Sequence, residues 1–216
     1  MREPTRLFAL RHGRTAWNAE ARIQGQLDVP LDELGRWQAE RLAEALAGED
    51  ITTIYSSDLQ RALATAQPLV ARTGAALHTD VRLRERGFGS FEGRTYADIQ
   101  ATWPDAALRW RQREVGFRPG GGEALTPFFE RCVSTVCEMA AKHPGQNIAI
   151  VAHGGVLDCL YRAAVGVDLN APRSWLLGNA SINRLLYTGS GFVLVGWDDH
   201  AHLEDGAAFG AAAPPA

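Results

Sequence analysis

The stretch Leu7-Phe8-Ala9-Leu10-Arg11-His12-Gly13 is a short apolar run followed directly by Arg-His-Gly. A second stretch far along the chain, Ile148-Ala149-Ile150-Val151-Ala152-His153-Gly154, likewise ends its apolar run in His-Gly. Short apolar runs of this kind are typical of strands that are buried on both faces of a parallel sheet. The two stretches therefore predict two buried strands, each followed at once by a histidine and a glycine.

Short apolar runs alternate with helical patterns along the rest of the chain, which predicts an α/β fold with a mostly parallel sheet. A β-branched run at residues 52–55 predicts another strand. Apolar residues at helical spacing predict three helices: residues 32–48, a helix with Asp58 as its N-cap, and residues 123–142. Residues 182–187 and 192–197, which are joined by turn-forming residues, predict a hairpin.

The chain has 216 residues with 22 basic and 25 acidic side chains, so its formal net charge is -3. This balance excludes the strongly basic field of a dedicated nucleic-acid binder and argues against an anionic membrane as a partner. All the basic side chains except Lys142 are arginines, an excess shared with 34 alanines. Because GC-rich coding favours both residue types, we interpret most of the arginines as a compositional bias.

Three cysteines, Cys132, Cys137 and Cys159, form no Cys-x-x-Cys pair, which indicates buried, reduced thiols rather than a disulfide framework or a zinc ribbon. The apolar run before Arg11 is too short for a signal-peptide core or a membrane span, so we expect a cytoplasmic protein. The chain length predicts one domain over residues 1–205, and the low-complexity residues 206–216 are expected to form a disordered tail.

Polar side chains follow four of the predicted strands or short apolar runs. Ligands of open α/β sheets bind beyond the carboxyl ends of the strands, so these residues are the first candidates for a site. They are Arg11-His12-Gly13, Ser56-Ser57 with Arg61 one turn later, Arg84-Glu85, and His153-Gly154. We therefore expect two histidines, two arginines and one carboxylate to converge at one edge of the sheet.

Each of these residues also has a plainer interpretation. A lone histidine at a strand end is more often a capping or surface group, although the repeated His-Gly argues for a site. Arg61 lies in the first turn of its helix, where a cation opposes the helix dipole, and this misfit indicates a nearby anion. The alternative for Arg61 is a weak surface pair with Asp58. Glu85 lies among arginines, and a solvated, salt-bridged face is the default interpretation of that segment.

Five blocks of sequence follow one another in a fixed order over about residues 5–200. They are Arg11-His12-Gly13 with Asn18 and Gln24-Gly25; Ser56-Ser57-Asp58-Leu59-Gln60-Arg61-Ala62 with Thr65-Ala66; Arg84-Glu85 with Gly89-Ser90-Phe91-Glu92-Gly93; Gly122-Glu123; and Val151-Ala152-His153-Gly154-Gly155. Together they resemble the histidine phosphatase superfamily, and more narrowly its phosphoglycerate mutase-like branch. The resemblance implies a three-layer α/β/α sandwich with a small cap inserted at about residues 89–122.

The resemblance further implies that His12 is the nucleophile that forms a phosphohistidine and that Glu85 is the proton donor. It assigns the phosphate and substrate pocket to Arg11, His12, Asn18, Gln24, Gly25, Arg61, Glu85, His153 and Gly154. The chain departs from the family's usual pattern at Arg14, where an acidic residue or Gln is often found, and at Ala124, where Ser is often found. These departures bear on the choice of substrate more than on the chemistry.

These residue types suit phosphoryl transfer, in which negative charge spreads over three equatorial oxygens. Arginine binds phosphate through a planar fork and stays charged, and an unprotonated histidine nitrogen can attack phosphorus. We therefore expect a metal-independent phosphomonoester hydrolase that uses no cofactor and acts on a small phosphorylated sugar or sugar acid. In the expected cycle, His12 attacks the phosphate, and Glu85 protonates the leaving alcohol and then activates the water that hydrolyses the phosphohistidine.

Other functions stay open at this stage. A phosphoglycerate mutase would move the phosphoryl group between hydroxyls of a sugar acid, but the short interval between Glu85 and His153 resembles phosphatase-type chains. A zinc or iron site made of His12, His153 and Glu85 is disfavoured by the adjacent Arg11. A non-catalytic phosphate-binding module is less favoured because nucleophile, acid and both arginines are present. A nucleotide-binding domain is disfavoured because the chain has no Gly-x-x-x-x-Gly-Lys loop.

The cap combines aromatic and basic residues: Trp103, Trp110 and Phe117 with Arg109, Arg111, Arg113 and Arg118. One interpretation is that the aromatic side chains shape a pocket for the leaving group while one arginine binds a carboxylate or a second phosphate. The other is that the aromatic side chains pack a helix and the arginines are solvated. Because edges of such sheets often pair, the sequence also allows a homodimer.

Overall fold

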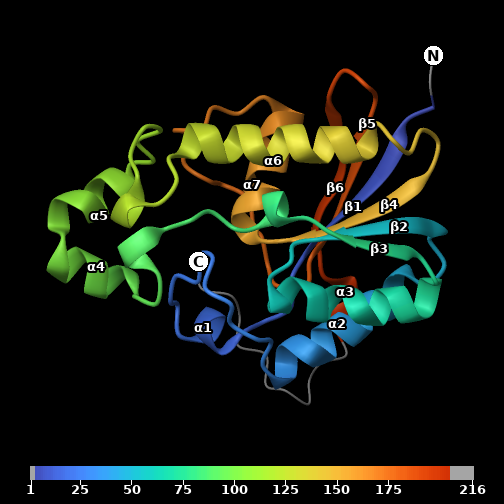
Figure 1. The fold of residues 1–216 in the computed structure, drawn as a ribbon, viewed down its shortest axis with the longest axis horizontal. Coiled ribbons are helices and arrows are strands. Elements are labelled where there is room, and N and C mark those ends of the chain that lie inside the picture. The colour runs from blue at the N-terminus through green and yellow to red at the C-terminus, as the bar shows by residue number, and fades with distance from the viewer. Residues whose placement is uncertain (1–2, 205–216) are drawn as a thin grey trace.

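The computed structural model describes residues 3–204, whose centre is a six-stranded sheet with the strand order β3-β2-β4-β1-β5-β6 (Figure 1). The strands are β1 Thr5–Arg11, β2 Ile51–Ser56, β3 Ala76–Thr79, β4 Asn147–Ala152, β5 Ile182–Tyr187 and β6 Phe192–Asp199. The pairs β2-β3, β2-β4 and β1-β4 are parallel, and β5 and β6 join the sheet in antiparallel pairing. The predicted sheet and hairpin are confirmed.

Two pairs of helices cover the sheet, one pair on each face (Figure 1). Helices α2 Glu33–Leu46 and α3 Gln60–Thr73 pack on one face, and α6 Leu125–Ala140 and α7 Gly154–Val165 pack on the other. The side chains of β1 alternate between these layers, as a strand requires. Leu7 and Ala9 join the core with α6 and α7, whereas Phe8 and Leu10 join the core with α2 and α3. The expected three-layer sandwich is confirmed.

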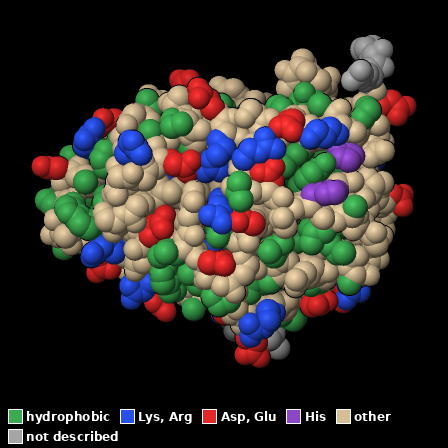
Figure 2. Space-filling view, viewed as in Figure 1, with side chains coloured by type: hydrophobic (Ala, Val, Ile, Leu, Met, Phe, Trp, Pro, Cys, Tyr) green, Lys and Arg blue, Asp and Glu red, His purple; other side chains and the backbone are tan. Residues whose placement is uncertain are grey.

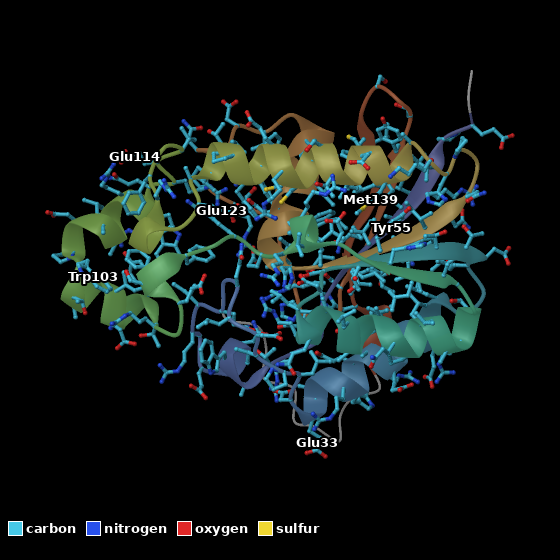
Figure 3. The ribbon with its side chains drawn as sticks, in the orientation of Figure 1. Glu33, Tyr55, Trp103, Glu114, Glu123 and Met139 are labelled. Carbon is cyan, nitrogen blue, oxygen red and sulfur yellow. The ribbon has the colours of Figure 1, made fainter. Side chains whose placement is uncertain are left out.

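The cap, residues 89–122, lies to the left of the sandwich in Figure 1, beyond the carboxyl ends of the parallel strands. It contains the 3-10 turns η2 Gly89–Phe91 and η3 Pro119–Gly121 and the helices α4 Tyr96–Thr102 and α5 Pro104–Arg111. The side chains of Phe91, Ile99, Ala107 and Phe117 form a small core inside it. Trp103, labelled in Figure 3, stacks on Phe91 with 5.6 Å between ring centroids. Most of the cap's aromatic side chains therefore hold the cap together.

The short elements are helix α1 Ala16–Ala19 and the 3-10 turns η1 Val81–Leu83 and η4 Ala201–Leu203. Three local expectations differ from the structure. Helix α3 has Leu59, not Asp58, as its N-cap, because the Asp58 carboxylate is bound by Arg84 at 2.7 and 2.5 Å. The same contact rules out the proposed pair of Asp58 with Arg61. Arg84 and Glu85 follow η1 rather than a strand, and α6 begins at Leu125, two residues later than expected.

Residues 206–216 lie outside the described residues, and the division of the chain into one domain with an inserted cap stays a prediction. Cys132, Cys137 and Cys159 are free thiols; the first and third are buried, whereas Cys137 is half-buried rather than buried. None of the described helices is both long and apolar enough to cross a membrane.

Candidate active site

A cavity of about 380 Å³ lies at the ends of β1 and β4, between the sandwich and the cap. Six parts of the chain form its wall, and their residues are Arg11, His12, Asn18, Arg22, Ile23, Gln24, Gly25, Arg61, Glu85, Phe88, Trp110, Gly154, Gly155 and Arg173. Of the site residues expected from the sequence, all except His153 line this cavity. His153 is fully buried next to His12, with 5.2 Å between the two ring centroids.

His12 presents one nitrogen to the cavity in a defined state. Its Nδ1 lies 2.7 Å from the carbonyl oxygen of Gly13, which can only accept, so Nδ1 donates and Nε2 keeps its lone pair. Burial, together with Arg61 and Arg11, holds the pKa of His12 well below its usual value of 6.5. The ring is therefore neutral at neutral pH. The acceptor that sequence reasoning left unnamed is the adjacent carbonyl group.

Two glycines allow the close approaches that bring this site together. A Cβ on Gly13 would lie 2.4 Å from the carbonyl oxygen of Gly35, at the start of α2. A Cβ on Gly155, in the first turn of α7, would lie 2.1 Å from Oε1 of Glu85. Both distances are shorter than any real Cβ contact, so larger residues would displace the His12 loop or the Glu85 carboxylate.

His153 is oriented by Ser57, a residue whose role sequence reasoning missed. The Nε2 atom of His153 lies 2.8 Å from Oγ of Ser57, and its Nδ1 is buried without a partner. Burial, Arg61 and His12 lower the pKa of His153 well below 6.5. The ring is therefore neutral, and a hydroxyl that donates to Nε2 leaves Nδ1 with the proton. Only their neighbouring positions after adjacent strands, β2 and β4, signalled that the two side chains could meet.

The two arginines of the site are fixed by loop carbonyl groups, and the buried Nε donor of each has no partner. Arg61, which is fully buried, donates to the carbonyl oxygens of Leu27 and Gly25 at 2.8 Å each. Arg11 donates to the carbonyl oxygen of Leu177. The Nε atoms of both arginines are buried without a partner. Burial lowers the pKa of Arg11 to about 10, so it remains charged at neutral pH.

The carboxylate of Glu85 is held by two backbone donors. The amide of Arg86 donates to Oε1 at 2.8 Å, and the amide of Gly155 donates to Oε2 at 2.9 Å. The backbone of Glu85 is held in turn by the side chain of Gln26, which donates to its carbonyl oxygen at 3.2 Å, and by Arg131. Arg131 also pairs at 2.7 Å with Glu123, which Figure 3 labels between the cap and α6.

The remaining expected residues also reach the cavity. Asn18 accepts hydrogen bonds from Thr15 and Asn179 through Oδ1, and Gln24 is buried with its Oε1 unpaired. Gly25 lies at a positive φ of 53°, and Gly154 lies beside the guanidinium of Arg11. Across the described residues, four of the eight buried side-chain polar atoms without a partner belong to this site: Arg11 Nε, Gln24 Oε1, Arg61 Nε and His153 Nδ1.

The four cap arginines chosen from the sequence do not line the cavity. Arg109 pairs with Glu114, a residue labelled in Figure 3, and covers the ring of Phe117. Arg113 binds Asp158, and Arg118 donates to the carbonyl oxygen of Gly122. Arg111 is exposed. Of the cap residues, only Trp110 reaches the cavity wall. The additional cations there are Arg22 and Arg173, neither of which the sequence singled out.

Comparison with known proteins adds three findings. A sequence profile of the histidine phosphatase superfamily (branch 1) matches residues 7–200. The phosphoglycerate mutase-like protein 4 of Arabidopsis thaliana is 40% identical over 204 residues, which cover 92% of this chain and 87% of that protein. The glucosyl-3-phosphoglycerate phosphatase of Mycobacterium tuberculosis is 39% identical over 204 residues, covering 89% and 91%. The solved structure of the Entamoeba histolytica phosphoserine phosphatase in complex with 3-phosphoglyceric acid has a TM-score of 0.83 at 26% identity, covering 92% and 99%.

Proposed function

The chain belongs to the histidine phosphatase superfamily (branch 1) and is an enzyme, and we propose that it hydrolyses phosphomonoesters of small metabolites through a phosphohistidine at His12. One observation supports this proposal above the others. Next to a neutral histidine with a free Nε2, the half-buried Arg11 and the buried Arg61 and His153 each keep a buried nitrogen donor without a partner. Buried donors left unpaired are costly, at about 1 to 3 kcal/mol each, and a bound phosphate would satisfy them.

The first half-reaction forms the bond between phosphorus and His12. Nε2 attacks the phosphorus with its lone pair while Nδ1 keeps its proton and donates it to the carbonyl oxygen of Gly13. The bond from phosphorus to the ester oxygen breaks, and Glu85 transfers its proton to that oxygen, so the alcohol leaves neutral. Arg11, Arg61 and Nδ1 of His153 stabilise the charge on the three equatorial oxygens.

The second half-reaction returns the enzyme to its starting state. Glu85, now a carboxylate, takes a proton from a water molecule whose oxygen attacks phosphorus. The bond from phosphorus to Nε2 breaks, and inorganic phosphate is released with the neutral His12. The backbone amides on both oxygens of Glu85 keep the carboxylate in the same place for both proton transfers.

The positive charge for this cycle comes from arginine, and we propose no metal or cofactor. The alternative metal site from His12, His153 and Glu85 is disfavoured at His153, because Nε2 of that ring is bonded to Ser57 and the proton lies on Nδ1, so neither nitrogen has a free lone pair. Among residues 3–204, no three His, Cys, Asp or Glu side chains are grouped as a metal site.

Hydrolysis is favoured over mutase activity by the access of water. A mutase must keep water away from its phosphohistidine while the bound sugar acid reorients in the cavity. Here Glu85 and Gly155 are partly exposed, and the cap covers the cavity with Trp110 alone. We propose a small phosphorylated sugar or sugar acid as the substrate. The cytoplasmic location and the homodimer stay predictions.

A metal-free assay tests the proposed function. Wild type, His12→Ala and Glu85→Gln are compared on p-nitrophenyl phosphate and 3-phosphoglycerate in the presence of a chelator, with phosphate release and isomerisation followed separately. His78→Ala, which removes an exposed histidine outside the cavity, is the matched control. We expect release by wild type and the control, at least about 1,000-fold less by His12→Ala, and an acid-labile, alkali-stable phosphoryl label that requires His12. Release that survives His12→Ala would refute the mechanism, and isomerisation faster than release would indicate a mutase.

A further inference from the structure

Arg173 is an exposed cation on the wall of the cavity. It belongs to residues 166–181, which connect α7 to β5, and it lines the cavity together with Arg11. Within the described part of the chain its guanidinium has no hydrogen bond and no ion pair. The mechanism proposed above gives it no task.

The other cavity cations all have partners. Arg11 and Arg61 are fixed by loop carbonyl groups and border the phosphate position. Arg22 pairs with Glu20 at 2.6 Å and donates to the carbonyl oxygen of Gly93 at 2.9 Å. Among the described residues of the cavity wall, Arg173 is therefore the cation whose guanidinium has no hydrogen-bond partner.

The backbone on both sides of Arg173 is fixed. Before it, the carbonyl oxygen of Ala171 accepts a hydrogen bond from buried Arg162 at 3.0 Å. After it, Trp175 stacks on Tyr161 at 4.1 Å, and the carbonyl oxygen of Leu176 accepts from Trp197 at 3.0 Å. An anchored backbone with an unpaired guanidinium differs from a mobile surface arginine, because the position of its charge is already restricted before a ligand arrives.

Charge balance supports a ligand here. Arg173 and Arg11 repel each other, and after burial this repulsion contributes to the lowered pKa of Arg11. A phosphate at His12 would balance Arg11 and Arg61, and Arg173 would still lack an anion. Another part of the wall is apolar, with Ile23, Phe88 and Trp110. The cavity thus has a position for the phosphate, an apolar wall for the carbon skeleton of the substrate, and Arg173 as a further cation.

We propose that Arg173 is a specificity-determining residue that binds the carboxylate of a substrate whose leaving group is a hydroxy acid. This inference rests on the proposed function, since it assumes that the phosphate lies at His12. A carboxylate fits better than a second phosphate because the single charge of the guanidinium balances one carboxylate rather than a dianion. The guanidinium fork can hold that carboxylate with two parallel hydrogen bonds.

The test uses two substrates that differ only in the anion. In 3-phosphoglycerate a carboxylate stands where glycerol 3-phosphate has a hydroxymethyl group. Wild type, Arg173→Ala and Arg173→Lys are compared with Arg111→Ala, which removes one exposed arginine that does not line the cavity. We expect wild type to prefer 3-phosphoglycerate. Arg173→Ala should lower kcat/KM for it by about 10- to 100-fold, chiefly through KM, and change glycerol 3-phosphate by less than about twofold.

The controls separate the possible outcomes. Arg173→Lys should retain part of the preference, and Arg111→Ala should match wild type. An equal loss on both substrates, or no preference in wild type, would overturn the inference. An Arg173-dependent preference for propane-1,3-diol bisphosphate over 3-phosphoglycerate would overturn the carboxylate assignment. Hydrolysis of p-nitrophenyl phosphate that depends on His12 shows in the same experiment that the proposed function holds, whatever Arg173 does.

Discussion

Ser57 decides which nitrogen of His153 can meet a phosphate oxygen. Its hydroxyl lies 2.8 Å from Nε2, and the only other hydrogen bond to Oγ comes from the amide of Leu59 at 3.3 Å. The hydroxyl proton is thus free to point at Nε2, which places the ring proton on Nδ1. Ser57 does not line the cavity, so we regard it as a positioning residue for His153.

Ser57→Ala should lower kcat by about fivefold, because the ring loses the hydrogen bond that selects the Nδ1-protonated tautomer, and one such bond is worth about 1 kcal/mol. Ser56→Ala is the matched control, since Ser56 is equally buried and its hydroxyl donates to the carbonyl oxygen of Ser57. Urea unfolding and kcat are measured for both variants. Both should lose stability, but only Ser57→Ala should lose activity; equal activity losses would contradict the positioning role.

The sequence predicted those residues whose position follows from a strand end. His12 and Arg61 reach one cavity because the parallel strands β1 and β2 bring their carboxyl ends to one edge of the sheet, whereas Glu85 follows the turn η1. His153 follows β4 in the same way but is fully buried, a depth that no spacing encodes. Arg173 could not be predicted, because it comes from a long connection without periodicity whose path depends on stacking between Trp175 and Tyr161.

At the scale of elements, one ion-pair group ties the cap to the sandwich. Arg113, just after α5, donates to Oδ2 of Asp158 on α7 at 3.0 Å and to the carbonyl oxygen of Leu169 at 2.9 Å. Asp158 also pairs with Arg162, which is buried in the same helix. Arg113 holds a positive φ of 54°, an unusual conformation for a residue with a Cβ. The backbone there is strained, and the side-chain contacts compensate for the strain.

Arg113→Ala should loosen the cap and lower the free energy of unfolding by about 1 to 3 kcal/mol, the range for hydrogen bonds to charged groups. Alanine has the same difficulty with a positive φ, so the change isolates the side-chain contacts. Chymotrypsin cleavage at the cap's aromatic residues and the urea midpoint measure the effect. Arg111→Ala, two positions away and exposed, is the control. If both variants resist chymotrypsin equally, Arg113 does not tie the cap down.

Elements with strong periodicity were predictable, and elements defined by tertiary contacts were not. The buried strands β1 and β4 appear as apolar runs, whereas β3 lies at the sheet edge and is mostly exposed, so it leaves no such run. The N-cap of α3 was mistaken because Asp58 has the residue type of a cap, but a distant Arg84 competes for its carboxylate. The helices α4 and α5 are short, and their buried side chains belong to the small core of the cap.

For the whole molecule, compositional bias explains the number of arginines but not the contacts that they make. Figure 2 shows Lys and Arg side chains interspersed with Asp and Glu over the visible face, in keeping with many exposed ion pairs. Several inner arginines instead donate to loop carbonyl groups: Arg61, Arg86, Arg131 and Arg162. A guanidinium has five donors in a fixed plane, which lets one side chain join two loops. The net charge of -3 hides this inner set.

Folding also buries histidines in a neutral state, and this makes the stability of the whole molecule depend on pH. The pKa values of His12 and His153 are lowered by burial first and by the neighbouring cations second, and burial likewise lowers that of His202. Between the lowered values and 6.5 the unfolded chain binds more protons than the folded chain. The contribution of these histidines to the free energy of unfolding is therefore fully present above about pH 7, and it is lost as the pH drops below about 6.5. Carboxylates such as Asp58, whose pKa is lowered by Arg84, lose their contribution only at more acidic pH.

Urea midpoints measured from about pH 8 to 5 test this dependence. Wild type and the His78→Ala control should lose stability over the lower half of that range, and His12→Ala should lose less because one neutral buried histidine is gone. On the proposed function, inorganic phosphate would bind the folded cavity and favour protonated histidines. It should then raise the urea midpoint and reduce the loss at low pH, with about 2.7 kcal/mol of added stability at a hundred times its Kd. Stability that rises as the pH falls would contradict the neutral state of the buried histidines. A phosphate effect that persists in full in His12→Ala and Arg61→Ala would show that the cavity is not the phosphate site.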